Sequence, residues 1–142
     1  MIWVGIDTGV HTGFAVWDSS AGRFLAVETL RIDEALFRVL AIAAECGDDG
    51  VTVVVEDARQ RKWVPNTGDV RKEMARRLGA GAVKRDAKIW EDFLAGNKIA
   101  HQMRPPLKGC TKLTEERFAA LTGHVGRTSE HSRDAAMLVF RR

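Results

Sequence analysis

Two strongly apolar segments of this chain each end in an acidic residue, and this feature most constrains how the chain can fold. Residues 1–6 are apolar or glycine and precede Asp7, while residues 51–55 are all β-branched and precede Glu56. Segments of this composition favour buried strands. A carboxylate at the end of a buried strand is costly unless a cation or hydrogen-bond donors meet it. We therefore expect Asp7 and Glu56 to belong to a polar site.

Another candidate pair lies near the start of the last helical segment, where His131 and Asp134 are three residues apart. This spacing places both side chains on one helix face. Carboxylates and imidazole are ligands of divalent cations. Together with Asp7 and Glu56, they could hold the pair of metal ions that phosphodiester hydrolysis uses.

Each residue also has a purely structural interpretation. Asp7 could cap the turn that follows its strand. His131 and Asp134 could form an exposed helix start, where an acidic side chain interacts favourably with the helix dipole. Glu56 has the weakest such alternative, because glutamate caps turns poorly and its strand is expected to be buried.

The order of elements predicts a single α/β domain over residues 1–142. Short turns between the first three strands imply an antiparallel meander. The β-branched run at residues 51–56 is typical of a central strand with helices on both faces of the sheet. We thus expect a mixed five-stranded sheet, with three antiparallel strands followed by two parallel ones. The expected strands are residues 2–7, 14–17, 23–30, 51–56 and 98–103, and the expected helices are residues 32–46, 69–94, 114–121 and 130–140.

The long helix predicted at residues 69–94 contains two glycines, Gly79 and Gly81, each of which weakens a helix by about 1 kcal/mol relative to alanine. They could allow close approach to the sheet or to another subunit. The residues expected to form its buried stripe are Val70, Met74, Leu78, Ala82, Ile89 and Phe93.

Composition narrows the class of protein without assigning a function. The formal net charge is +3, a small excess that is weak evidence for a nucleic-acid partner. Cys46 and Cys110 are far apart and fit reduced thiols. No apolar run reaches the ~18 residues of a membrane span, and no signal-peptide pattern opens the chain. We expect a cytoplasmic protein with no membrane partner and no small-molecule cofactor.

Basic residues gather after Glu56 and before the last helices, where they could contact phosphates. Trp63 could stack on an unpaired base, or it could anchor the core. The basic residues could equally form an ordinary solvated face. The candidate DNA contacts are Arg59, Arg61, Lys62, Trp63, Arg71, Lys108 and Lys112, with Lys72, Arg76, Arg77 and Arg104 as further basic positions.

Three segments carry a resemblance to a known family. They are VGIDTGVHTG at residues 4–13, VVVE at residues 53–56 and HSRDAAML at residues 131–138. In this order they resemble the RuvC-like branch of the ribonuclease H-like nucleases, which are Holliday junction resolvases, and the short chain is more similar to phage or prophage members. Many members have aspartate where His131 stands, and the familiar bacterial enzyme has an aromatic residue where Arg59 stands.

The resemblance implies a crossover junction endodeoxyribonuclease that cuts branched DNA as a homodimer. Asp7, Glu56, His131 and Asp134 would then hold two Mg²⁺ ions, with Mn²⁺ able to substitute. Lys112 resembles a family lysine that contacts DNA near the active site.

Other functions stay open. The chain could be a nuclease of the same fold that acts on forks or RNA–DNA hybrids, or a catalytically silent module that binds junctions. Actin-like kinases also begin with an apolar strand, an aspartate and a Thr-Gly turn, but they need two such domains and a longer chain.

Overall fold

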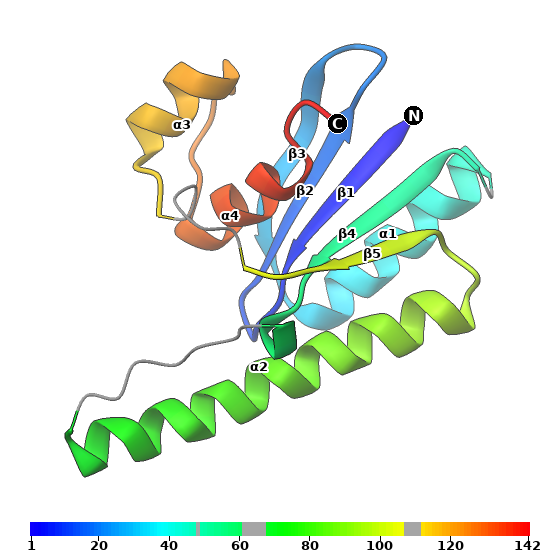
Figure 1. Cartoon of the computed structure of the whole chain (residues 1–142). Coiled ribbons are helices and arrows are strands. Elements are labelled where there is room, and N and C mark those ends of the chain that lie inside the picture. Colours follow the sequence, from blue (N-terminus) through cyan, green and yellow to red (C-terminus); the bar gives the residue numbers. More distant parts are fainter. Residues whose placement is uncertain (48, 61–67, 107–111) are drawn as a thin grey trace.

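The computed structural model describes residues 1–47, 49–60, 68–106 and 112–142 (Figure 1). Its strands are β1 (Ile2–Asp7), β2 (Thr12–Asp18), β3 (Arg23–Leu30), β4 (Val51–Glu56) and β5 (His101–Arg104). Its helices are α1 (Ile32–Cys46), the short 3₁₀ helix η1 (Ala58–Gln60), α2 (Val70–Gly96), α3 (Glu115–Thr122) and α4 (Glu130–Val139). No helix within these described ranges is long and apolar enough to cross a membrane.

The strands form one mixed sheet in the order β3-β2-β1-β4-β5. β1 and β2 pair antiparallel, as do β2 and β3, whereas β4 pairs parallel with both β1 and β5. The predicted α/β class and sheet are confirmed. β5 begins three residues later than predicted because the chain is still leaving α2, where Lys98 has φ 57° and the Ile99 N–H donates to the Leu94 carbonyl.

Two cores lie on opposite faces of the sheet. Val4, Ile6 and Val55 point toward the helices α1 and α2, where Trp90 and Leu94 are fully buried against them. On the other face, Ala15 and Val54 pack with the buried residues of α4. Figure 1 shows α1 and α2 on one side of the strands and α4, with α3 beyond it, on the other.

Only the second half of α2 packs on the sheet. Figure 1 shows its first half extending past the domain, and there the side chains of Val70, Met74 and Leu78 are 78%, 66% and 73% exposed. The predicted buried stripe is therefore wrong for these residues and for Ile89, which is 40% exposed. The helical periodicity is real, but no described part of the domain covers the first half of that stripe.

Two glycines bring the backbone of α4 directly onto the strands. A Cβ atom on Gly5 of β1 would lie 2.1 Å from the carbonyl oxygen of Ala135. A Cβ atom on Gly13 of β2 would lie 2.0 Å from the carbonyl oxygen of His131. Both distances are far below van der Waals contact, so any larger residue at either position must push α4 away from the sheet.

We expect Gly5→Ala to destabilise the protein by about 2 kcal/mol or more, because its methyl group meets backbone that cannot rotate aside. Gly96→Ala in α2 is the matched control, since nothing lies within 4 Å of a Cβ atom there. Chemical denaturation compares the two. A Gly5→Ala variant as stable as the Gly96→Ala variant would contradict the close packing of α4.

Candidate active site

Asp7 and Glu56 end adjacent parallel strands and point to the same face of the sheet. Ile6 pairs in register with Val55, so the next residue along each strand is Asp7 and Glu56. Ile6 and Val55 point into the α1 and α2 core. Side chains alternate along a strand, so Asp7 and Glu56 face α4. This register places both carboxylates at the same end of two neighbouring strands.

The N-terminal half of α4 supplies the other two predicted residues. Ser129 caps the helix, its side-chain oxygen accepting from the Ser132 N–H at 3.1 Å. The carbonyl oxygen of His131 lies over Gly13, and the Nδ1 atom of His131 lies 2.9 Å from Oδ2 of Asp7. The fold thus joins two positions 124 residues apart in the sequence, as the proposed site requires.

Asp134 lies one turn further along α4. Its Oδ1 atom accepts a hydrogen bond of 3.1 Å from the backbone N–H of Lys112. Lys112 has φ 66°, in the left-handed region, and its Nζ atom lies 3.9 Å from Glu130. The backbone of Lys112 thus places this predicted DNA contact beside Asp134. The side chain of Lys112 is exposed and can reach a ligand.

The surroundings of this site make ionisation of its aspartate side chains less favourable. Burial is the largest cause that raises the pKa of Asp7 above the usual aspartate value. The hydrogen bond and charge of His131 oppose that rise, while the charges of Asp134 and Glu130 add to it. Burial also raises the pKa of Asp134, against the lowering effect of the Lys112 N–H. A bound cation would relieve this desolvation and repulsion.

The donor chemistry of the site fits a hard divalent cation, since carboxylate oxygens are the ligands that Mg²⁺ prefers. The side chains of this site are not arranged as a metal centre in the structure. Among the residues that the structure describes, no group of three or more histidine, cysteine, aspartate or glutamate side chains is placed to hold an ion. Asp7 instead pairs with His131.

Arg59, predicted as a DNA contact, has carboxylate partners within the domain. Its Nε atom lies 2.7 Å from Asp57, and a terminal nitrogen lies 2.9 Å from Glu91 of α2. The bond to Arg59 holds the pKa of Asp57 below its usual range, and the bond to Glu91 ties the end of β4 to α2. Sequence reasoning missed this network because nothing in the sequence pairs position 59 with position 91. Contact of Arg59 with DNA stays a prediction.

The remaining predicted DNA contacts are spread around the site. Arg71 is exposed in the first turn of α2, where Asp69 caps the helix. Arg61, Lys62, Trp63 and Lys108 lie outside the described residues, as do the side chains of Arg76 and Arg77.

The other histidines have structural surroundings. His11 is exposed in the turn between β1 and β2, and His101 bonds through Nδ1 to the Ile99 carbonyl at 2.8 Å. His124 packs edge-on against Phe24 and Phe118. None of these contacts involves Asp7 or Glu56.

Comparison with known proteins adds a structural likeness. No protein-family model and no curated protein matches the chain. A solved structure of Thermus thermophilus RuvC aligns over 99% of this chain and 92% of that chain, at 20% sequence identity and a TM-score of 0.48. At this level of similarity the alignment does not by itself assign a family or an activity.

Proposed function

We propose that this protein is a metal-dependent endonuclease of the ribonuclease H-like type that cuts branched DNA, with Holliday junctions as its main substrate. The observation that supports this most is the hydrogen bond between Asp7 and His131 across the interface between the sheet and α4. Glu56 ends the neighbouring strand on the same face, and Asp134 lies one turn further along α4. The Asp7 carboxylate is buried and its pKa is raised, which is typical of functional sites.

Asp7, Glu56 and Asp134 would hold the metal ions, with His131 as a further ligand or a proton carrier. When bound, two divalent ions activate the attacking water and stabilise the leaving oxygen. Asp7, on the central strand, is the candidate to serve both ions. The side chain of His131 is 52% exposed, so its imidazole can exchange protons with solvent or substrate. Lys112 would contact a phosphate beside Asp134.

We propose further that the protein acts as a homodimer through the first half of α2. Val70, Met74 and Leu78 recur every four residues and form an apolar stripe on a helix that extends beyond the domain. A stripe of this kind packs well against its own copy. A four-way junction has two-fold symmetry, and paired cuts need two active sites. The dimer would supply both.

We expect Asp7→Asn to reduce cleavage of a four-way junction by at least about a hundredfold, because a neutral amide is a poor ligand for Mg²⁺. Cleavage is measured on four-way junction, fork, linear duplex and RNA–DNA hybrid. The matched control is Asp18→Asn at the end of β2 that is remote from Asp7, where the carboxylate accepts turn hydrogen bonds from the backbone of Ser20 and Ala21.

This set of substrates separates the alternative functions of the protein. Preferred cleavage of the hybrid or the fork would move the protein to another nuclease class. Tight junction binding without cleavage in Mg²⁺ or Mn²⁺ would indicate a silent binding module. Full activity of Asp7→Asn would contradict the proposed site.

We expect Mn²⁺ to support cleavage at least as well as Mg²⁺, because imidazole is a softer ligand than carboxylate. Replacing the imidazole in His131→Asp should shift the ratio of initial rates toward Mg²⁺. Initial rates in each metal, for both proteins, measure the effect. Strong inhibition of the parent protein by Mn²⁺ would argue against direct ligation by His131.

We expect Met74→Glu with Leu78→Glu to convert a dimer into a monomer, because four negative charges would meet in one interface. Light scattering should give about twice 15.7 kDa for the parent and 15.7 kDa for the variant. Phe37→Glu, at a 72% exposed position of α1, is the control and should remain dimeric. A monomeric parent protein would contradict the dimer.

A further inference from the structure

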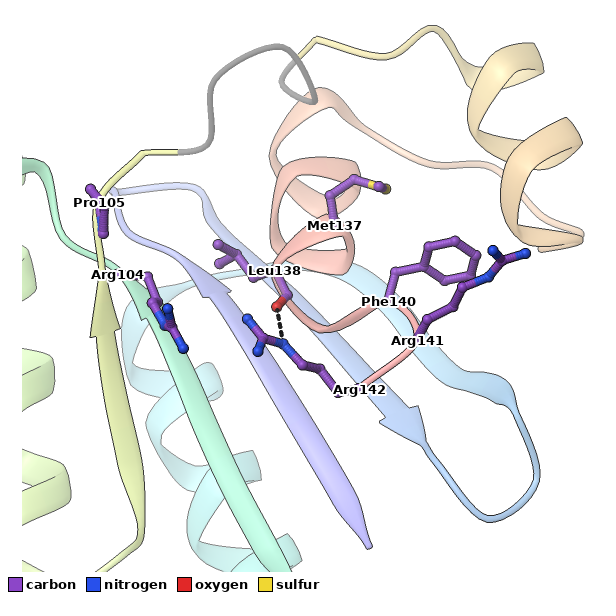
Figure 2. Close-up of a pocket in the computed structure, with 7 residues that line it drawn as sticks. All are labelled: Arg104, Pro105, Met137, Leu138, Phe140, Arg141 and Arg142. Carbon is purple, nitrogen blue, oxygen red and sulfur yellow. Dashed lines mark hydrogen bonds between the residues drawn. The ribbon is translucent and has the colours of Figure 1, made fainter.

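A pocket of about 410 Å³ lies between the end of β5 and the end of α4, apart from the four residues of the candidate active site. Arg104 and Pro105 line one side of it, and Met137, Phe140 and Arg142 line the other. Figure 2 shows the guanidinium groups of Arg104 and Arg142 turned toward this space. Arg141, also at the rim, turns its guanidinium group toward α3. We call this space the Arg104–Arg142 pocket.

Both inward arginines are held in place by neutral groups. Gln102 accepts hydrogen bonds from Arg104, the shorter of them 2.9 Å long. Arg142 donates through Nε to the Leu138 carbonyl, and its guanidinium carbon lies 5.9 Å from the centre of the Trp3 ring. No aspartate or glutamate side chain is among the residues that line the pocket. An anion between the two guanidinium groups would be attracted to both of them.

The anion that best suits the pocket carries a phosphate. Arginine forms paired hydrogen bonds to phosphate oxygens through its planar guanidinium group. The pocket is larger than a single inorganic ion needs, so it has room for a phosphate together with the sugar that carries it. The chemistry therefore matches a nucleotide unit rather than an isolated ion.

The pocket lies on the same face of the sheet as the candidate active site. Arg104 pairs in register with Glu56, and Met103 before it packs in the α1 and α2 core. Side-chain alternation therefore places Arg104 on the α4 face, in the same cross-strand row as Glu56 and Asp7. Trp3, beside Arg142, lies four residues along β1 from Asp7, which is about 13 Å. A strand bound at the carboxylates would reach the pocket within a few nucleotides.

We propose that the Arg104–Arg142 pocket binds the backbone phosphate of a DNA strand that leaves the cleavage site over β5. This inference rests on the proposed nuclease function and adds to it a second contact, on the far side of Glu56 from Asp7. The pocket holds the strand and takes no part in breaking the phosphodiester bond. Free phosphate or a free mononucleotide shares the same chemistry, and the experiment separates these sources.

Junction binding is measured between 50 and 200 mM salt in an Asp7→Asn background, which prevents cleavage. We expect Arg104→Gln with Arg142→Gln to make the slope of log affinity against log salt shallower by about 0.7–0.9, because one phosphate contact is lost. Over this salt range, that difference changes the ratio of parent to variant affinity by about threefold. Arg104→Lys with Arg142→Lys should restore most of the slope.

The matched control is Arg38→Gln with Arg85→Gln, which removes the same charge from α1 and α2 on the other side of the sheet. Its slope should stay close to that of the parent. A pocket variant that melts normally and keeps the full slope would overturn this inference while leaving the nuclease proposal intact. A parent protein that binds no branched DNA would overturn the nuclease proposal, and this inference with it.

Thermal melting with inorganic phosphate and with a deoxynucleoside monophosphate tests the other sources. Protection of the parent by either anion, absent from the Gln variant and accompanied by an unchanged DNA slope, would assign the pocket to a small anion and overturn the DNA proposal. A slope change with no protection by either free anion supports the DNA strand as its occupant.

Discussion

The close approach of α4 to β1 and β2 is the contact on which the arrangement of the candidate site depends. Gly5 and Gly13 leave no side chain between the strands and the backbone of Ala135 and His131. The N-terminal turn of α4 therefore sits directly on the strand ends. If this helix were one side chain further away, the His131 imidazole could not lie 2.9 Å from Asp7.

This packing places a carboxylate where its charge is poorly solvated. Asp7 is 9% exposed, and its raised pKa records the cost of ionising it there. The site has acidic side chains at the ends of β1 and β4 and at the start of α4. The positive end of the α4 dipole compensates only part of their charge. Natural proteins accept such costs mainly at functional sites. The same face carries Arg104 beyond Glu56, so one positive side chain follows two negative ones along this row of the sheet.

Local patterns in the sequence predicted the elements whose stability comes from the domain itself. Strands β1, β3 and β4 and helix α1 have the predicted bounds, because each shows a clear apolar pattern with a turn signal beside it. The meeting of Asp7 with His131 was also predicted, since strand ends and a helix start converge in this topology. The ion pairs of Arg59 with Asp57 and Glu91 could not be predicted, because they depend on where α2 crosses the sheet. The exposed stripe on α2 looked like a core face, because periodicity alone does not say what covers it.

The central claim is that the carboxylates of the candidate active site share divalent cations. Calorimetric titration of the protein with Mn²⁺ tests this claim most directly. The account predicts saturable binding to the parent protein, since a cation would relieve the burial and charge repulsion that raise the pKa of Asp7. It predicts much weaker binding to Asp7→Asn and unchanged binding to Asp18→Asn. Equal binding to all three proteins, or no binding to the parent, would contradict it.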